Sequence, residues 1–280
     1  MDHYSLLGNP VEHSKSPWIQ GRFAELTGEA VHYDKQLVAL DGFTAAVQAF
    51  NAAGGKGCNV TVPFKLQAAA LATHPSARVQ LAGACNTLRF DGQEIHADNT
   101  DGIGLMRDIT DNAGVPLTGR DVLLIGAGGA GAGVLGPLLE LRPRRVVLAN
   151  RTAERAHQVA AVHAALAAEH GVMLESCGLA DAPVLESSFD VVLNASSSSL
   201  HGTGVPVPAS VLRPGALACD PMYGPAAQVF LDWAQTHGAT PRDGLGMLVE
   251  QAAAAFAFWR GVYPPTGPVL NEMRQRLAAA

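Results

Sequence analysis

The sequence lacks the marks of several large protein classes. Its four cysteines are scattered, with no Cys-x-x-Cys pair, and its ten histidines form no His-Glu-x-x-His motif. We therefore expect buried free thiols, as in a cytoplasmic protein, and no metal site. The first residues show no basic region followed by a long apolar core, which argues against a signal peptide and agrees with a cytoplasmic location.

Long hydrophobic runs and basic runs are missing as well. No stretch of 18 uninterrupted apolar residues occurs, so no membrane span is expected. Charged residues make up 16% of the chain, the formal net charge is -6, and lysine and arginine form no long run. This charge distribution argues against nucleic acid and anionic membranes as partners.

What the chain does have is enough hydrophobic material for two domains. It has 280 residues, of which 48% are hydrophobic. Strand and helix patterns alternate through the first hundred residues, and Asp91-Gly92 marks one hairpin. A second α/β pattern follows a bridging helix that begins at Asp101. We predict two α/β domains, residues 1–101 completed by C-terminal helices at about 245–280, and residues 102–244.

Local signals in the first half predict where several elements begin. Ser16 is expected to cap a helix that has proline at its first position. A second helix is expected from Asp41. Residues 57–62 are typical of a strand, and Pro63 is expected to end it and open a helix.

A glycine-rich segment at residues 126–131 reads Gly-Ala-Gly-Gly-Ala-Gly, which fits G-x-G-x-x-G. It follows a short apolar strand at residues 121–125 and opens a helix, the context that a dinucleotide-binding loop requires. The first glycine allows the tight turn and the second lets a pyrophosphate approach the backbone. The helix N-terminus adds N–H donors and a favourable dipole.

The tip of the following strand indicates which dinucleotide binds. A site for NAD usually has an acidic residue about 20 positions after the loop. Here Asn150-Arg151-Thr152 ends the strand, and Arg155 follows. Guanidinium groups bind phosphate through paired hydrogen bonds, so NADP is favoured.

Polar residues in the first half gather at the ends of expected elements. Ser14 and Ser16 precede a helix and suit a carboxylate, although a plain helix cap is the commoner use of such serines. Asn59 and Thr61 are two apart, so they are expected to face the same side of a strand. Lys65 projects near a strand-to-helix junction, where it is either a solvated charge or part of an active site.

Seven segments together form a pattern that extends over nearly the whole chain. They are residues 13–17 (His-Ser-Lys-Ser-Pro), 59–65 (Asn-Val-Thr-Val-Pro-Phe-Lys), 83–88 (Gly-Ala-Cys-Asn-Thr-Leu), 98–102 (Asp-Asn-Thr-Asp-Gly), 126–130, 150–152 and 243–248 (Asp-Gly-Leu-Gly-Met-Leu). In this order they resemble the shikimate dehydrogenase family. A single segment of this kind can occur by chance in an unrelated protein, whereas all seven in this order are specific to the family.

The resemblance implies a reaction and a fold. The reaction is the reversible reduction of 3-dehydroshikimate to shikimate with NADPH, in the biosynthesis of chorismate and the aromatic amino acids. The fold has an N-terminal substrate domain and a Rossmann-type NADP domain, with a cleft between them. The resemblance also implies a monomer or a homodimer.

The same resemblance implies roles for individual residues. Lys65 and Asp101 match the catalytic pair. The substrate-binding positions are Ser14, Ser16, Asn59, Thr61, Asn86, Tyr223 and Gln251. The cofactor-binding positions are Gly126, Ala127, Gly128, Gly129, Ala130, Asn150, Arg151, Thr152, Arg155 and Gly244.

Two alternatives and some departures from the family remain open at this level. An acidic residue at the strand tip would have favoured an NAD-dependent quinate/shikimate dehydrogenase, whereas Asn150-Arg151 argues against it. Absence of Lys65 or Asp101 would have favoured a non-catalytic dinucleotide-dependent sensor, but both residues are present. The chain departs from the family at Gly131-Ala132-Gly133, at Asn194-Ala195-Ser196 and over residues 224–229. The first departure removes a possible phosphate contact, and the last alters a loop near the cofactor and the substrate tyrosine.

Overall fold

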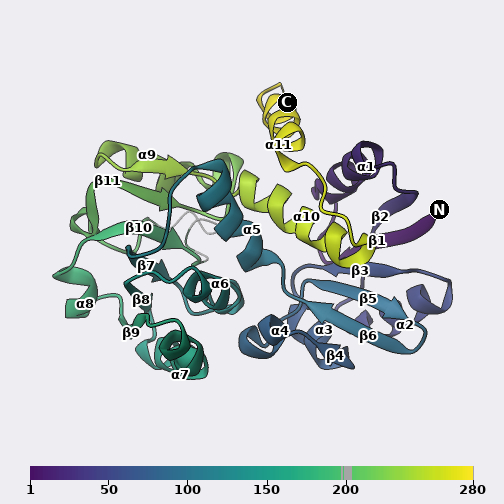
Figure 1. Cartoon of the computed structure of the whole chain (residues 1–280), viewed down its shortest axis with the longest axis horizontal. Helices are drawn as coiled ribbons and strands as arrows, with labels where there is room; N and C mark the ends of the chain where they lie inside the picture. Colours follow the sequence, from purple (N-terminus) through teal and green to yellow (C-terminus); the bar gives the residue numbers. More distant parts are fainter. Residues whose placement is uncertain (197, 199–203, 280) are drawn as a thin grey trace. The chain divides into compact units, whose positions relative to one another are not determined.

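The computed structural model describes residues 1–196, 198 and 204–279. The chain forms two compact units, one of Met1–Gly104 with Leu248–Ala280 and one of Leu105–Met247. Each unit is built on its own six-stranded sheet (Figure 1). The predicted α/β fold is thereby confirmed.

The first unit has a mixed sheet in the order β2-β1-β3-β5-β6-β4. Strands β1, β2 and β3 are parallel, and β5 and β6 form the predicted antiparallel hairpin around Gly92, whose φ is 60°. The elements are β1 (Asp2–Gly8), α1 (Ser16–Thr27), β2 (Val31–Leu37), α2 (Phe43–Ala52), β3 (Gly57–Val60), α3 (Lys65–Leu71), β4 (His74–Pro75), α4 (Ala77–Ala82), β5 (Thr87–Asp91), β6 (Glu94–Asp98), α5 (Asp101–Arg107), α10 (Leu245–Arg260) and α11 (Thr266–Ala278). The unit boundaries fall within α5 and α10.

The second unit has a fully parallel sheet in the order β12-β11-β10-β7-β8-β9. Counted from β7, this is the strand order of the doubly wound dinucleotide-binding fold. The elements are the π-helix η1 (Asp108–Asn112), β7 (Asp121–Ile125), α6 (Gly129–Glu140), β8 (Arg145–Asn150), α7 (Ala153–Glu169), β9 (Met173–Gly178), α8 (Ala182–Leu185), β10 (Phe189–Asn194), η3 (Ala209–Val211), β11 (Leu212–Cys219), η4 (Gly224–Ala226), α9 (Gln228–Thr236) and β12 (Thr240–Arg242).

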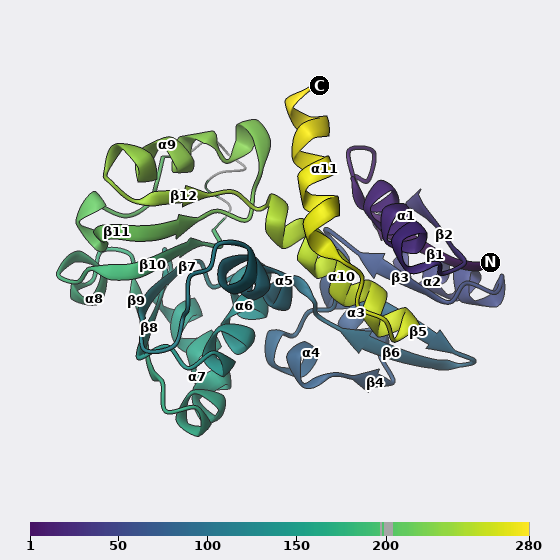
Figure 2. The same cartoon turned by 45° about the horizontal axis from the view of Figure 1, so that its top comes forward.

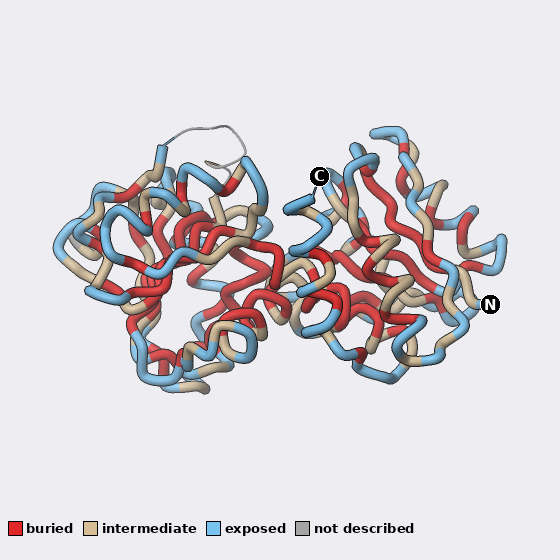
Figure 3. The backbone as a smooth tube through the Cα atoms, turned by 90° about the horizontal axis from the view of Figure 1, so that it is seen from above, coloured by how far each residue is buried: buried red, intermediate tan, exposed pale blue. Residues whose placement is uncertain are grey.

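Alternation along the strands of the second unit creates two cores. Leu124 and Leu148 pack with α6 and α7 on one face, whereas Leu123 and Val147 pack with α8 and α9 on the other. All five residues of β7 are buried, as its apolar sequence predicts for a strand covered on both faces. Figure 2 shows α9 beside β11 and β12, and Figure 3 shows in red the backbone of the buried residues.

Four predicted boundaries in the first unit are wrong. Ser16 is the first residue of α1 rather than its cap, and the backbone N–H of Ser16 donates to Ser14 Oγ at 3.2 Å. Strand β3 ends at Val60, so Thr61 lies in a turn closed by a hydrogen bond from Phe64 N to Thr61 O. That turn contains the cis Val62–Pro63 bond, and α3 begins at Lys65. Helix α2 likewise begins at Phe43, two residues after Asp41.

Short elements were not predicted at all. β4 has two residues and α4 has six, too few for a periodic pattern. Within the described part of the chain, no helix has both the length and the apolar character that crossing a bilayer requires.

The four free cysteines are buried, which leads to a prediction about their reactivity. Burial raises the pKa of Cys85 to about 12 and of Cys177 to about 11, and also raises those of Cys58 and Cys219. Since only the thiolate attacks a disulfide reagent, we expect no rapid reaction in the native protein at pH 8 and four reactive thiols after unfolding in guanidinium. Titration with Ellman's reagent measures this, and one fast native thiol would contradict the burial described.

Candidate active site

Lys65 and Asp101 meet in the first unit. Each stands at the first position of its helix, Lys65 on α3 and Asp101 on α5. Lys65 Nζ donates to Asp101 Oδ2 at 2.5 Å, and the two side chains keep 31% and 15% of their surface exposed. The pair is therefore shielded yet reachable by a small molecule. The turn before Lys65 is anchored by Phe64, which is fully buried and stacks on Phe43 at 4.8 Å between ring centroids.

Asn86 fixes the carboxylate of Asp101 from the other side. Its Nδ2 lies 2.8 Å from Asp101 Oδ1, 3.0 Å from Thr100 Oγ1 and 3.4 Å from Gln251 Oε1. Its Oδ1 accepts from the backbone N–H of Thr100 at 2.9 Å and from Thr87 Oγ1 at 2.9 Å. One carboxylate oxygen of Asp101 therefore accepts from the Lys65 ammonium and the other accepts from the Asn86 amide. Together these hydrogen bonds set the orientation of the ammonium.

Asn59 continues this network to a residue that was not predicted, Tyr33 on β2. Asn59 Nδ2 donates to Thr87 Oγ1 at 3.0 Å and to Asn86 O at 3.2 Å, and Tyr33 OH donates to Asn59 Oδ1 at 2.8 Å. Burial raises the pKa of Tyr33 well above its usual value, so the phenol stays protonated and remains a donor, while a hydrogen bond with Ser16 opposes this rise. A continuous set of hydrogen bonds therefore runs from Tyr33 through Asn59, Thr87 and Asn86 to Asp101.

The other predicted substrate residues of this unit lie around the same network. Ser14 and Thr61 are half-buried, whereas Ser16 and Asn59 are buried. Gln251 of α10 contacts Asn86. Hydrogen bonds thus link Asn59, Asn86, Gln251, Asp101 and Lys65, whereas Ser14 contacts Ser16 and Thr61 lies two residues after Asn59. Tyr33 carried no sequence signal, because a buried tyrosine hydroxyl needs a partner but its partner is 26 residues away.

Tyr33→Phe tests the support of Asn59. The substitution removes the donor to a buried amide oxygen, so we expect a loss of about 1 kcal/mol in the free energy of unfolding. Because Asn59 then loses its fixed orientation, KM for the substrate should rise more than kcat falls. Urea unfolding and steady-state kinetics measure the two effects. If neither changes, Tyr33 does not position Asn59.

The glycine loop of the second unit has the backbone that a pyrophosphate requires. Gly126 follows β7 with φ of 105°, and a Cβ there would lie 2.8 Å from the Ala195 backbone. Gly131 is one of the positions at which the chain departs from the family. A Cβ there would lie 1.9 Å from Gly126 O, so glycine at this position allows α6 to pack closely on the loop. A Cβ on Gly128 would meet nothing within 4 Å, so the backbone there is open to a ligand. No side chain caps α6, which leaves its N-terminal N–H groups for an anion.

The strand tip of β8 lines the same hollow, which has a volume of about 680 Å³. Arg151 and Arg155 are exposed, and among the described residues neither has an acidic partner. Asn150 Oδ1 accepts from Ala127 N at 3.1 Å, which ties the strand tip to the glycine loop. The open glycines, the uncapped helix and the two guanidinium groups fit the pyrophosphate and 2′-phosphate of NADP.

Tyr223 and Gly244 follow β11 and β12, so they lie at the same carboxyl edge of the sheet as the glycine loop. Gly244 N donates to Met222 O at 2.8 Å, and a Cβ on Gly244 would lie 1.8 Å from Pro221 O. Only glycine allows this approach of the two loops. Burial raises the pKa of the half-buried Tyr223, which keeps its hydroxyl protonated.

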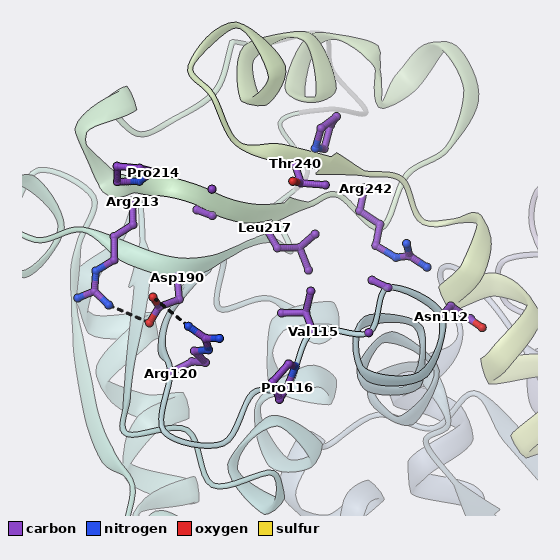
Figure 4. A pocket seen from close by; sticks show the side chains of 15 residues that line it. Asn112, Val115, Pro116, Arg120, Asp190, Arg213, Pro214, Leu217, Thr240 and Arg242 are labelled. Carbon is purple, nitrogen blue, oxygen red and sulfur yellow. Dashed lines mark hydrogen bonds and ion pairs between the residues drawn. The ribbon is translucent and has the colours of Figure 1, made fainter.

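A second hollow of about 600 Å³ lies at the opposite, amino edge of this sheet (Figure 4). Arg213 Nη1 lies 2.8 Å from Asp190 Oδ2, and Arg120 Nη1 lies 3.7 Å from Asp190 Oδ1. Burial favours a higher pKa for Asp190, but the hydrogen bonds from Asp121 N and Arg213, with the charges of Arg213 and Arg120, lower it. Arg120 and Arg213 are thus paired with Asp190 within the protein. Because ligands of parallel sheets of this kind bind at the carboxyl edge, this hollow is not the cofactor site.

Comparison with protein families covers most of the chain. Residues 6–88 match the shikimate dehydrogenase substrate binding domain, and residues 108–202 match shikimate / quinate 5-dehydrogenase. Residues 244–274 match the shikimate 5′-dehydrogenase C-terminal domain. A curated relative from Acidovorax sp. (strain JS42), shikimate dehydrogenase (NADP(+)), is 64% identical over 278 residues, which cover 99% of this chain and 98% of the relative.

Two solved structures extend the comparison. An Ael1 enzyme from Pseudomonas putida is 45% identical, with a TM-score of 0.89, covering 97% of this chain and 98% of that one. Shikimate 5-dehydrogenase from Thermus thermophilus, in complex with NADP(H) and shikimate, is 28% identical, with a TM-score of 0.83, covering 98% and 99%. The resemblance predicted from the seven segments is confirmed.

Proposed function

The chain belongs to the shikimate dehydrogenase family, and on that premise we propose that Lys65 and Asp101 carry the proton transfer of its reaction. The protein is an NADP-dependent oxidoreductase that reversibly reduces 3-dehydroshikimate to shikimate, a step of the shikimate pathway that leads to the aromatic amino acids. The relatives support neither an NAD-dependent quinate enzyme nor a sensor. The observation that supports the catalytic pair is the contact of Lys65 Nζ with Asp101 Oδ2 at 2.5 Å.

The proposed mechanism assigns proton transfer to the protein. When bound, NADPH supplies the hydride for the C3 carbonyl. Lys65 donates a proton to the carbonyl oxygen as negative charge develops there. Asp101, held by Asn86, orients the ammonium and accepts from the substrate hydroxyl. In the oxidative direction the neutral amine of Lys65 takes that proton back.

Substrate recognition is assigned to hydroxyl and amide groups. The hydroxyls of Ser14 and Ser16 hold the substrate carboxylate. Shikimate carries hydroxyls on its ring, and these suit the amide and hydroxyl partners that the network provides. The residues proposed for the ring hydroxyls are Asn59, Thr61, Asn86, Tyr223 and Gln251.

Cofactor binding is assigned to the second unit, and substrate binding to residues of the first unit together with Tyr223. The glycine loop takes the pyrophosphate, and Asn150, Arg151, Thr152 and Arg155 take the adenosine side with its 2′-phosphate. Gly244 contacts the nicotinamide end. We propose a cytoplasmic enzyme, since its four cysteines are free thiols, and the expected assembly is a monomer or a homodimer.

A steady-state assay that crosses shikimate and quinate with NADP and NAD tests this function. We expect the highest kcat/KM for shikimate with NADP. If quinate with NAD is preferred, the assignment of Arg151 and of the substrate is wrong. If none of the four combinations is turned over, the enzyme assignment itself is wrong.

A further inference from the structure

Three side chains with metal-binding atoms meet on one face of the first sheet, away from the residues of the proposed mechanism. His3 lies on β1, and His32 and Asp34 lie on β2. The strands are parallel and paired with His3 opposite His32 and Ser5 opposite Asp34. Since side chains two apart on a strand share a face, all three belong to the same face. We call them the His3–His32–Asp34 cluster.

The cluster is compact and partly shielded. His3 Nε2 lies 3.0 Å from Asp34 Oδ2, and the two imidazole rings lie 4.9 Å apart between centroids. One ligand atom from each residue lies within 4.8 Å of the others. His3 and Asp34 each keep 39% of the side chain exposed, and Phe50 packs edge-on against His3. His32 is exposed, so the cluster opens to solvent on its side.

The carboxylate of Asp34 is incompletely satisfied. Its Oδ1 is buried and has no hydrogen-bond partner among the described residues, while Oδ2 faces His3. A buried acceptor without a donor costs about 1–3 kcal/mol. Because no donor offsets the charge of the carboxylate at Oδ1, a cation bound at the accessible oxygen, Oδ2, is favoured.

We propose that the His3–His32–Asp34 cluster binds one divalent transition-metal ion, with Zn²⁺ as the best fit. Two imidazole nitrogens and one carboxylate oxygen are a ligand set that Zn²⁺ and Co²⁺ accept, with water in the open position. Ligand atoms of a tetrahedral site lie about 3.3 Å apart, given metal–ligand distances of about 2.0–2.2 Å. The exposed His32 provides the side-chain rotation that closes this gap. His3 presents a lone pair once its Nε2 proton moves to Nδ1 or to solvent.

The site was not predicted from the sequence, because its ligands come from two strands. The segment His32-Tyr33-Asp34 contains only two of the ligands, and the third, His3, lies 29 positions before His32. Only the parallel pairing of β1 with β2 brings His3 alongside.

The first unit also contains a second cluster, which serves as an internal control. His74 Nε2 and His96 Nε2 lie 3.4 and 3.8 Å from Glu94 Oε2. The side chains of His74 and Glu94 are 50% and 59% exposed, and β4 has only two residues. A ligand on a two-residue strand, such as His74, is held less firmly than ligands on a seven-residue ladder such as that of β1 and β2. We therefore assign the tighter site to His3, His32 and Asp34.

The position of the cluster indicates a structural effect of the metal. His3 lies near the amino end of β1, whereas Lys65 follows the carboxyl end of the parallel strand β3. A metal would join β1 to the edge strand β2 without touching the catalytic pair. We expect bound Zn²⁺ to raise the melting temperature and to leave kcat unchanged.

The test uses the full chain without a polyhistidine tag, treated with EDTA and then freed of it. Calorimetric titration with Zn²⁺ should show one tight equivalent, and bound Co²⁺ should show visible absorption. His32→Ala, at an exposed position, should weaken this site by about 10- to 100-fold or more, and Asp34→Asn should do the same. His74→Ala should leave it unchanged.

Three results would overturn the proposal. They are the absence of binding to the wild-type protein, unchanged tight binding in His32→Ala, and loss of the tight site in His74→Ala instead. If His32→Ala fails to fold by circular dichroism, Asp34→Asn decides, because it keeps the shape of the side chain and removes its charge.

Discussion

Lys65→Ala is expected to lower kcat by about 10²- to 10⁴-fold, the usual contribution of a positioned proton donor. Shikimate should still bind, because the proposed contacts of Ser14, Ser16 and Asn59 do not involve the lysine. Steady-state kinetics together with shikimate binding by calorimetry separate the two effects. Lys56→Ala is the matched control, since Lys56 is an exposed lysine of the same unit.

Lys65→Arg separates proton transfer from charge. A guanidinium has a pKa above about 12 and stays protonated, so it preserves the charge beside Asp101 but cannot exchange a proton. If Lys65 is the proton donor, Lys65→Arg is as slow as Lys65→Ala. Recovery of activity in Lys65→Arg would show that only charge is needed, and unchanged turnover in Lys65→Ala would exclude the assignment.

Arg151→Ala is expected to raise KM for NADP by about 10- to 100-fold while changing KM for NAD little. Hydrogen bonds to a charged group contribute about 1.5–3 kcal/mol, and 1.4 kcal/mol is tenfold in binding. The comparison of the two cofactors isolates the 2′-phosphate, because NAD lacks only that group. Steady-state kinetics with each cofactor at saturating shikimate measure the difference.

Arg120→Ala provides the control for this prediction. Arg120 lies at the amino edge of the same sheet, 46% exposed and 3.7 Å from Asp190. Its removal should affect neither cofactor. Equal weakening of NADP and NAD by Arg151→Ala would mean that Arg151 does not contact the 2′-phosphate. In that case Arg155→Ala shows whether the second arginine does so.

Features set by neighbouring residues were predicted well from the sequence. The apolar strand β7, the glycine loop and the helix after it form one local unit, and the structure has all three in place. The hairpin of β5 and β6 follows from Asp91-Gly92 for the same reason. Where tertiary packing decides, the predictions were wrong. Phe64 is drawn into the core beside Phe43, so the chain turns before α3 and Thr61 leaves the strand.

The polar network shows the limit of sequence patterns most clearly. The motifs contained Asn59, Asn86 and Asp101, but not the bonds that join them. Those bonds depend on the sheet, which sets β3 beside β5 and β1 beside β2. Tyr33 enters the site only through this pairing, as does the His3–His32–Asp34 cluster.

The bond between Asn150 and the glycine loop has a consequence for redesigning cofactor preference. Asn150 Oδ1 accepts from Ala127 N, so a substitution at position 150 disturbs the loop that holds the pyrophosphate as well as the strand tip. Arg151 has no such contact with the loop among the described residues. An acidic residue introduced at position 151 would therefore alter the choice between the two nicotinamide cofactors while the affinity shared by both is preserved. In this protein, evolution or engineering can change one function of the strand tip by changing one residue and leaving its neighbour intact.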